Sequence, residues 1–282
     1  MGVTIVTDST CDLGSAAVRD LGVVVAPIWI IFGQERLRDG VDITRTNFNA
    51  RLVTAKDFPR TEPPEAAVFE ALFAKAVEAG NEVVAPIVSS GLSKTYANAS
   101  EAAVKFGGKV RVVDTQTLSG GQLLQVQVAG EMARAGASAA DIAEKLEAAR
   151  AKQHGYLITP DLTYLGRSGR INKAIVALGT VLKVNPVLQT KNGLVETAAQ
   201  TRTYEKAQEL MIEVAARHVE EATKTRFAVG HIEAPELAEH IVSLLKTKLG
   251  FPPKSLVVYE GGPTLSVNGG PGSLAIFFIA GV

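Results

Sequence analysis

The stretch that decides the fold of this chain is Val88-Ser89-Ser90-Gly91-Leu92-Ser93-Lys94-Thr95-Tyr96-Ala97-Asn98-Ala99. An apolar run, 82–88, leads into it, and an alanine-rich amphipathic segment, 95–106, leads out. This pattern predicts a strand, a tight turn and a helix. The first N–H groups of a helix lack partners inside the helix and carry the positive end of its dipole. Hydroxyl groups at such a turn suit a small anion, such as a carboxylate or a phosphate.

The hydroxyl groups of this turn also have a simpler explanation. Serine is a common N-cap on local grounds alone, so one serine would indicate only a helix start. The turn holds four hydroxyl side chains, those of Ser89, Ser90, Ser93 and Thr95. Four exceed what one cap requires, and we therefore predict a ligand site here, with ordinary capping as the alternative.

Composition and length limit the classes of protein to which this chain can belong. The 282 residues contain 29 basic and 29 acidic side chains, so no strong charge points to a nucleic acid or to an acidic membrane. Cys11 is the only cysteine, which excludes an intrachain disulfide and fits a reducing compartment. The first residues lack the pattern of a signal peptide, and no apolar run reaches the ~20 residues of a membrane helix. We expect a cytoplasmic protein that is not inserted in a membrane.

Strands alternate with helices through the first half of the chain. The predicted strands are 3–6, 23–31, 82–88 and 110–114, and the predicted helices are 13–21, 46–53, 65–79, 95–106, 121–134 and 138–152. This alternation predicts an α/β domain, residues 1–157, with a mostly parallel sheet and helices on both faces.

The second half of the chain has a different pattern of predicted strands and helices. The runs 185–189 and 194–201 flank Thr190-Lys191-Asn192-Gly193, which is a hairpin signal because Asn-Gly tolerates positive φ. The other predicted elements are strands 155–160, 227–232, 255–259 and 274–279, helices 173–181, 204–222 and 235–249, and a polar loop at 161–172. Hairpins with intervening helices predict an α+β domain, residues 158–282, with a mixed or antiparallel sheet.

Polar residues follow two strands of the first domain. Asp8-Ser9-Thr10 follows one strand and Asp114-Thr115-Gln116 follows another. Ligands of open αβ sheets bind beyond the carboxyl ends of the strands, so these groups should share a rim with the serine turn. The alternative is that each residue caps the helix after it. Gly269-Gly270-Pro271-Gly272 would allow close approach of a ligand, although a flexible turn explains it better.

No local pattern points to catalysis or to a bound metal. The four histidines lie apart, at His154, His218, His231 and His240. They lack the spacing of a metal site, and no serine has an evident histidine and acid partner. Cys11 lies near Asp8 and Asp12, whose charge raises the pKa of the thiol and blunts its reactivity. We therefore predict a binding site without a reaction, a cofactor or a metal.

Five segments resemble those of the DegV family, in the family's order and over the whole chain. They are Thr7-Asp8-Ser9-Thr10-Cys11-Asp12-Leu13, Ser89-Ser90-Gly91-Leu92-Ser93-Lys94-Thr95-Tyr96, Val113-Asp114-Thr115, Tyr164-Leu165-Gly166-Arg167-Ser168-Gly169-Arg170-Ile171 and Gly269-Gly270-Pro271-Gly272. The resemblance implies a bacterial cytoplasmic protein that holds one long-chain fatty acid in a tunnel between its two domains. It also implies that the protein is not an enzyme but presents the carboxylate to a fatty acid kinase, which makes an acyl-phosphate for phospholipid synthesis.

The resemblance also assigns residues. It implies that Thr61 and Ser93 bind the carboxylate, and Asn268 stands where the family has a histidine. It implies that Arg170, in the Gly-Arg-Ile sequence, meets the kinase. The further ligand-binding candidates are Ser90, Thr95, Gly269 and Gly270.

Two other positions depart from the family's pattern. Glu62 replaces a serine beside Thr61, and its charge would disfavour an anionic head group unless it points away. Lys94 replaces a glycine in the serine turn and could compensate that charge.

Two other classes of function compete with lipid binding. An enzyme that acts on a small carboxylated or phosphorylated metabolite between the domains would have a polar cleft and no copurifying lipid. A ligand-responsive regulatory module would require a partner that the sequence does not name.

Overall fold

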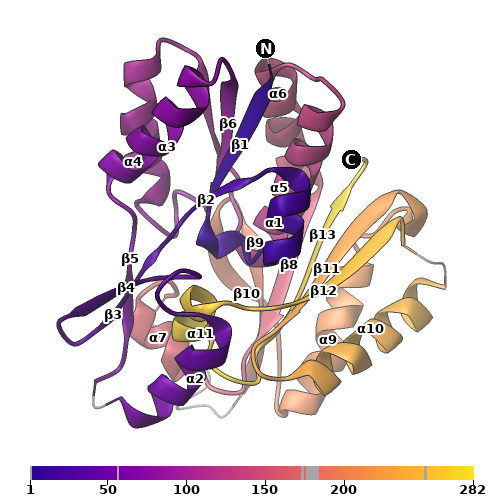
Figure 1. The fold of residues 1–282 in the computed structure, drawn as a ribbon. Coiled ribbons are helices and arrows are strands. Elements are labelled where there is room, and N and C mark those ends of the chain that lie inside the picture. The colour runs from indigo at the N-terminus through magenta and orange to yellow at the C-terminus, as the bar shows by residue number, and fades with distance from the viewer. Residues whose placement is uncertain (1, 56, 173–174, 176–183, 251–252) are drawn as a thin grey trace.

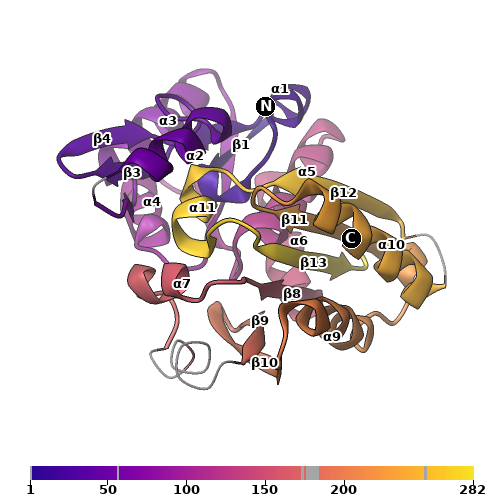
Figure 2. The same ribbon diagram turned by 90° about the horizontal axis from the view of Figure 1, so that it is seen from below.

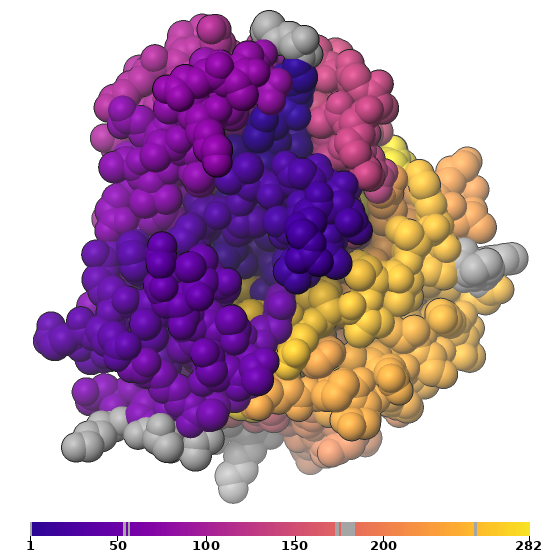
Figure 3. Space-filling model, in the orientation of Figure 1, coloured from indigo at the N-terminus to yellow at the C-terminus, as the bar shows by residue number. Residues whose placement is uncertain are grey.

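The computed structural model describes residues 2–55, 57–172, 175, 184–250 and 253–282 (Figure 1). These residues form a four-stranded sheet, a six-stranded sheet and a small three-stranded sheet. Figure 3 shows the surfaces of the two halves of the chain in contact, with the indigo N-terminal part against the yellow C-terminal part. No helix in the described ranges is long and apolar enough to cross a membrane.

The four-stranded sheet is parallel throughout, in the order β2-β1-β6-β7. Its strands are β1 (Val3–Asp8), β2 (Val24–Ala26), β6 (Glu82–Ile87) and β7 (Val110–Asp114). Successive side chains of a strand point to opposite faces, so Ile5 and Val6 of β1 enter two different cores. Burial on both faces is typical of a parallel sheet covered by helices.

Helices cover both faces of this sheet. One face packs against α3 (Ala66–Glu78) and α4 (Thr95–Ala103), and the other packs against α5 (Ser119–Arg134) and α6 (Ala139–Ala149). The predicted parallel α/β architecture is therefore confirmed. The chain also contains the peripheral helices α1 (Ser15–Leu21) and α2 (Arg45–Thr54).

The six-stranded sheet is mixed, in the order β10-β9-β8-β13-β11-β12. Its strands are β8 (Gln153–Ile158), β9 (Asn185–Lys191), β10 (Leu194–Thr201), β11 (Thr225–His231), β12 (Ser255–Glu260) and β13 (Leu274–Ala280). Only β11 and β12 pair in parallel. The predicted hairpin is confirmed, because β9 and β10 pair around Asn192 and Gly193, whose φ angles are 50° and 77°.

Helix α5 lies between the two large sheets (Figure 1). Val126 belongs to the core of the first sheet, whereas Leu123 packs with Phe277 and Ile279 of the second. The other face of the six-stranded sheet packs against α9 (Tyr204–Ala216) and α10 (Pro235–Leu249). The two domains are thus joined through a shared helix layer.

Proline ends one predicted strand early. The run 23–31 forms two strands, β2 and β3 (Trp29–Phe32), because Pro27 between them has no N–H for a sheet. Strand β3 then pairs with β4 (Glu35–Arg38) and β5 (Arg60–Glu62) in the small antiparallel sheet.

Two short helices were not predicted. The segment 161–172 contains α7 (Thr163–Ser168), where the N–H of Thr163 donates to Asp161 Oδ1 at 2.8 Å, so a continuous loop was the wrong prediction. The glycine-rich segment before the last strand contains α11 (Pro263–Gly269). Figure 2 shows α11 between the purple elements of the first domain and the strands of the second.

Other predicted boundaries differ from those in the structure or are not tested by it. Helix α9 ends at residue 216 rather than 222. The predicted domain boundary after residue 157 falls inside β8, whose residues pair in the six-stranded sheet, and the exact division stays a prediction. The predicted helix 173–181 lies outside the described residues, apart from residue 175.

Candidate functional site

A cavity lies between the domains, beyond the carboxyl ends of the parallel strands. We call it the first cavity, and its volume is about 80 Å³. Its walls come from the serine turn, from the small sheet, from β8 and β10, and from α7 and α11. They consist of Thr10, Ile28, Thr61, Glu62, Pro63, Val88, Leu92, Ser93, Leu118, Leu157, Leu165, Arg170, Val195, Thr264, Leu265 and Asn268.

A second cavity, also of about 80 Å³, adjoins the first. The two share part of their walls, namely Leu118, Leu157, Leu165, Leu265 and Asn268. The second cavity continues between β11, β12 and β13 along Ile232, Leu274 and Phe277. The two cavities together form a mainly apolar slot. Among its described wall residues, the guanidinium group of Arg170 lies at the first cavity, whereas hydroxyl side chains line both.

Arg170 and Thr61 meet in the wall of the first cavity. One guanidinium nitrogen of Arg170, Nη2, donates to Thr61 Oγ1 at 3.1 Å, and Nη1 donates to the carbonyl oxygen of Ser168 at 2.9 Å. Burial lowers the pKa of Arg170. No acidic side chain in the described ranges pairs with this arginine, so a partly desolvated positive charge faces the cavity. A buried charge without a counter-ion is unfavourable, and an anionic ligand would compensate it.

Ser93 bonds to Thr95, the first residue of α4, and lines the first cavity. Its Oγ accepts the N–H of Thr95 at 3.2 Å and lies 2.8 Å from Thr95 Oγ1. Thr95 is fully buried and lines neither cavity, so it holds Ser93 rather than facing a ligand. The serine turn therefore holds the start of α4 and also lines the first cavity, and ligand binding at this turn stays a prediction.

The other two serines of the turn point elsewhere. Ser90 Oγ donates to Asp114 Oδ2 at 2.5 Å, and the residue is exposed rather than part of either cavity wall. Ser89 Oγ donates to the carbonyl oxygen of Gly193 at 2.6 Å. This bond fastens the serine turn to the tip of the β9–β10 hairpin in the second domain.

Asn268 lines both cavities from α11. Its Nδ2 donates to the carbonyl oxygen of Thr264 at 2.6 Å, whereas its Oδ1 is buried without a hydrogen-bond partner. An amide nitrogen carries two hydrogens, so one donor remains beyond the bond to Thr264.

The glycines after Asn268 have different positions. Gly269 lines the second cavity, and its carbonyl oxygen accepts from the hydroxyls of Thr159 and Ser273 at 2.9 and 2.7 Å. Gly270 lines neither cavity. It has a φ of 77°, and a Cβ there would lie 2.6 Å from the ring of Tyr164. It therefore permits close packing of α7 on the turn after α11.

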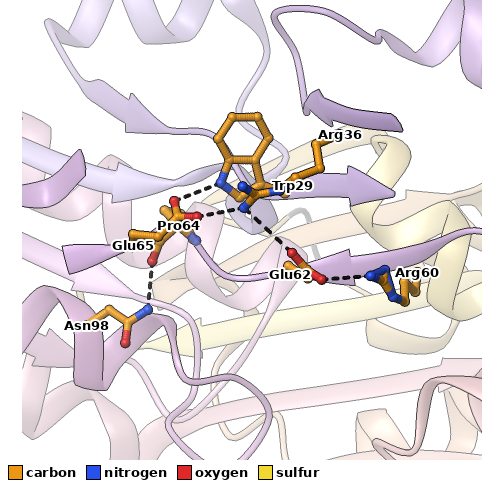
Figure 4. Close-up of polar contacts among 7 residues, drawn as sticks. All are labelled: Trp29, Arg36, Arg60, Glu62, Pro64, Glu65 and Asn98. Carbon is orange, nitrogen blue, oxygen red and sulfur yellow. Dashed lines mark hydrogen bonds and ion pairs between the residues drawn. The ribbon is translucent and has the colours of Figure 1, made fainter. Parts of the chain in front are cut away.

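The negative charge of Glu62 is compensated by two arginines (Figure 4). Its Oε1 lies 3.0 Å from Arg60 Nη2, and its Oε2 lies 3.6 Å from Arg36 Nη2. Lys94, the compensating residue that the sequence suggested, makes no ion pair in the described part of the chain. The carboxylate of Glu62 is thus turned to the arginines of the small sheet.

Further contacts hold the segment after Thr61 in place (Figure 4). Asn98 Nδ2, on α4, donates to the carbonyl oxygen of Pro64 at 2.7 Å. Glu65 accepts from Arg36 at 2.6 Å and from the indole nitrogen of Trp29 at 3.0 Å. Because α4 also begins at the serine turn, these contacts keep Thr61 and Ser93 in the same cavity wall.

The polar residues after the strands organise the rim of the sheet. Asp8 is fully buried and accepts from the backbone of Val88 at 2.9 Å and of Thr10 at 3.0 Å. Burial raises the pKa of Asp8. Asp114 accepts from Ser90 and from the N–H of Gln116 at 2.9 Å. Of these rim residues, only Thr10 reaches the first cavity.

Two buried aspartates hold the start of α11, a function that the sequence did not suggest. Asp12 Oδ1 accepts the N–H of Gly262 at 2.7 Å, and Asp39 Oδ2 accepts from the hydroxyl of Thr264 at 2.5 Å. Burial raises the pKa of Asp12 to about 7 and also raises that of Asp39. Pro263 at the first position of α11 was the signal that could have revealed this helix.

Comparisons with known proteins cover the whole chain. The model of the family described as "Uncharacterised protein, DegV family" matches residues 2–281. A DegV domain-containing protein from Deinococcus radiodurans is 32% identical over 276 residues, which are 98% of each chain.

Solved structures of similar proteins agree in fold. A DegV family protein from Thermus thermophilus, whose structure is described as showing fatty acid binding, has a TM-score of 0.89 and 31% identity, over 99% of this chain and 100% of that one. A stearic acid-binding protein from Eubacterium ventriosum has a TM-score of 0.89 and 26% identity, over 98% of this chain and 97% of that one. The chain described here belongs to the DegV family.

Proposed function

We propose that this protein binds a long-chain fatty acid, with its carboxylate in the first cavity and its acyl chain extending into the second. One observation carries the proposal: the slot is mainly apolar, and a partly buried arginine without an acidic partner among the described residues lies at one end only. Each buried CH₂ group contributes ~0.8 kcal/mol, so the chain supplies most of the affinity and the polar end sets the orientation. The fatty acids described for the Thermus and Eubacterium proteins support the same ligand class.

The proposed carboxylate ligands are Thr61, Ser93 and Asn268, each of which lines the first cavity. Arg170 adds a positive charge next to Thr61. Of the other predicted ligand residues, Ser90, Thr95 and Gly270 line neither cavity, whereas Gly269 lines the second.

The walls favour a lipid over a small polar substrate. Beyond the polar end, the shared wall of the two cavities consists of four leucines, Leu118, Leu157, Leu165 and Leu265, and of Asn268. An enzyme for a small carboxylated metabolite would leave this apolar surface unused. Ligand sites for small molecules are commonly apolar with a few convergent polar groups.

We further propose that the bound fatty acid is presented to a fatty acid kinase. The kinase would transfer the terminal phosphoryl group of ATP to a carboxylate oxygen and release ADP and the acyl-phosphate, so that the binding protein itself catalyses nothing. The position of Arg170 supports this step, because its loop also borders an open groove with Gly91 and Leu194. A contact between Arg170 and the kinase is part of this proposal.

Native mass spectrometry of the purified protein, before and after solvent extraction, tests fatty acid binding. We expect a mass increment that matches a fatty acid, and saturable binding of added palmitic acid by the extracted protein. Hexadecanol has the same chain length without a carboxylate and should bind more weakly. Failure of the extracted, folded protein to bind any long-chain fatty acid would overturn the proposal.

A further inference from the structure

A third cavity lies away from the slot, between β8, β9 and α9. Its volume is about 500 Å³, and it shares no wall residue with the first or second cavity within the described ranges. Gln116, from the loop after β7, reaches it from the first domain. The tip of the β9–β10 hairpin separates it from the serine turn, because Lys191 and Asn192 line it while the next residue, Gly193, accepts from Ser89.

The third cavity is lined by basic side chains without acidic ones. The basic residues are Arg150, His154, Lys191, Arg217 and His218, and none of the described wall residues is an aspartate or a glutamate. The whole chain has equal numbers of acidic and basic residues, so this excess is local. A wall of one charge raises the local concentration of oppositely charged solutes.

The acidic residues nearest to this wall neutralise it only in part. Glu147 lies 3.5 Å from Arg150 and Glu196 lies 3.4 Å from Lys191, and both glutamate side chains are about half exposed, at 56% and 45%. Exposed ion pairs of this kind are weak. Arg217 has no ion pair in the part of the chain that the structure describes.

Arg150 has a buried hydrogen-bond donor that is not satisfied by the described residues. Its Nε is buried and has no hydrogen-bond partner among the described residues, although the guanidinium contacts Glu147 through Nη2. An unsatisfied buried donor is unfavourable, and an oxyanion in the cavity could accept from it. Arginine is also well suited to phosphate, because its donors form a planar fork.

Two histidines stack in the same wall. The ring centroids of His154 and His218 are 4.7 Å apart, and that of Phe278 lies 4.9 Å from that of His154. Burial lowers the pKa of His154, and the charge of His218 lowers it further. The charged groups that line the cavity with this pair are Arg150, Lys191 and Arg217, of which Arg150 pairs with Glu147 and Lys191 pairs with Glu196. A bound anion would offset this repulsion and favour the protonated imidazoles.

We propose that the third cavity binds a phosphorylated small metabolite, with the phosphate between Arg150, Lys191 and Arg217. Three cations match a dianionic phosphate better than a singly charged carboxylate. The remaining wall carries amide and hydroxyl groups, among them those of Asn192 and Thr190, which suit the hydroxyl groups of a sugar. The cavity volume falls within the range of small-molecule sites, about 300–1,000 Å³. This site is independent of the fatty acid site.

Proton NMR of the histidine rings tests the proposal on the full chain. Inorganic phosphate, ribose 5-phosphate and AMP are titrated at constant ionic strength, with sodium chloride as the reference. We expect saturable shifts of the His154 and His218 signals, a rise in the pKa of both imidazoles, and tighter binding of the two esters than of phosphate. The Arg150→Gln/Arg217→Gln variant should bind each ester at least tenfold more weakly.

Arg111→Gln is the matched control, because Arg111 is exposed on β7 and lines none of the three cavities. It should bind the esters as the native protein does. Palmitic acid binding by the double variant shows that it is folded. Shifts no larger than those from sodium chloride, binding of phosphate without either ester, or unchanged ester binding by the folded double variant would each overturn the proposal.

Discussion

At the scale of single residues, the site depends on which hydroxyl of the serine turn faces the cavity. Ser93 lines the first cavity, whereas Ser90, three residues earlier, bonds to Asp114. Thr61 comes from a strand of the small sheet and meets Arg170 from the second domain. The proposed carboxylate site is therefore assembled from side chains that lie far apart in the sequence.

Alanine variants of these hydroxyls should separate ligand contacts from structural ones. Thr61→Ala and Ser93→Ala each remove a donor for a charged group, worth roughly 1.5–3 kcal/mol. That corresponds to roughly a tenfold to hundredfold loss of fatty acid affinity by titration calorimetry. Ser90→Ala, in the same turn but outside the cavity wall, is the control and should bind normally. Equal losses for Ser90→Ala and Ser93→Ala would contradict this assignment.

Replacement of Arg170 distinguishes a role in fatty acid binding from a role in contact with the kinase. If its charge in the cavity wall acts on the ligand, Arg170→Ala should weaken fatty acid binding as well as phosphorylation by a fatty acid kinase; this is the outcome we expect from its bond to Thr61. A contact with the kinase alone would leave the affinity unchanged and lower only the phosphorylation rate. Titration of palmitic acid together with a kinase assay separates the two, and unchanged affinity would argue against the ligand role.

Asn268 should act as an uncharged donor. Asn268→Leu removes its amide and should lower fatty acid affinity tenfold to hundredfold, since a hydrogen bond to a charged group is worth roughly 1.5–3 kcal/mol. Asn268→His should retain binding and add a dependence on pH near the imidazole pKa, with tighter binding on the acidic side, where the imidazolium carries positive charge. Fatty acid affinities of the native protein and the two variants, measured from pH 5.5 to 8.5, test whether Asn268 donates to the carboxylate. If a folded Asn268→Leu protein bound fatty acid with the native affinity, the carboxylate would be held by Thr61 and Ser93 without Asn268.

At the scale of elements, α11 carries Leu265 and Asn268 to both cavities and is held at its start by two aspartates of the first domain. Asp12 also accepts from the hydroxyl of Ser119 at 2.8 Å and is 4% exposed. Short helices have little stability of their own, so α11 depends on these contacts.

Replacement of Asp12 should change how stability depends on pH. Burial raises the pKa of Asp12 from 3.8 to about 7, so between these values the folded protein keeps a proton that the unfolded chain has lost. The free energy of unfolding therefore falls as pH rises through this window. Asp12→Asn removes the titration and should become more stable relative to the native protein from pH 4.5 to 7.5, by on the order of 4 kcal/mol.

Urea unfolding at four pH values across this window measures the effect. Asp20→Asn is the control, because Asp20 is exposed on α1 and its variant should follow the native curve. A constant difference between Asp12→Asn and the native protein at every pH would contradict the interpretation.

At the scale of the whole molecule, α5 joins the two sheets at close range. A Cβ on Gly120 would lie 2.7 Å from both Phe277 and the hydroxyl of Tyr259, two buried residues of the second domain. Both also line the second cavity. The contact of Gly120 with Phe277 and Tyr259 thus determines both the distance between the domains and the width of the slot.

Gly120→Ala should therefore destabilise the protein and disturb the slot. Overpacking of this kind costs about 1–3 kcal/mol, and displacement of Phe277 should also weaken palmitic acid binding. Gly130→Ala in the same helix is the control, because its Cβ would meet the flexible side chain of Leu21 at 3.2 Å. Thermal unfolding and ligand titration of both variants test this. Equal effects at the two glycines would mean that the interface is not tightly packed at Gly120.

The local elements and the fold class could be predicted from the sequence because neighbouring residues determine them. The serine turn lies between β6 and α4 where the apolar run changes to a helical pattern, and the Asn192-Gly193 hairpin forms because both residues tolerate positive φ. The family resemblance also named Thr61, Ser93 and Asn268, which line one cavity.

Only the tertiary structure decided where the side chains of these elements point and which charges they meet. Glu62 pairs with Arg36, 26 residues earlier, rather than with Lys94, and Ser90 turns to Asp114 while Ser93 turns to the cavity. The start of α11 rests on Asp12, 250 residues away. Local patterns encode backbone conformation, but the partner of a polar side chain depends on which distant segments the packed sheets bring within hydrogen-bond distance of it.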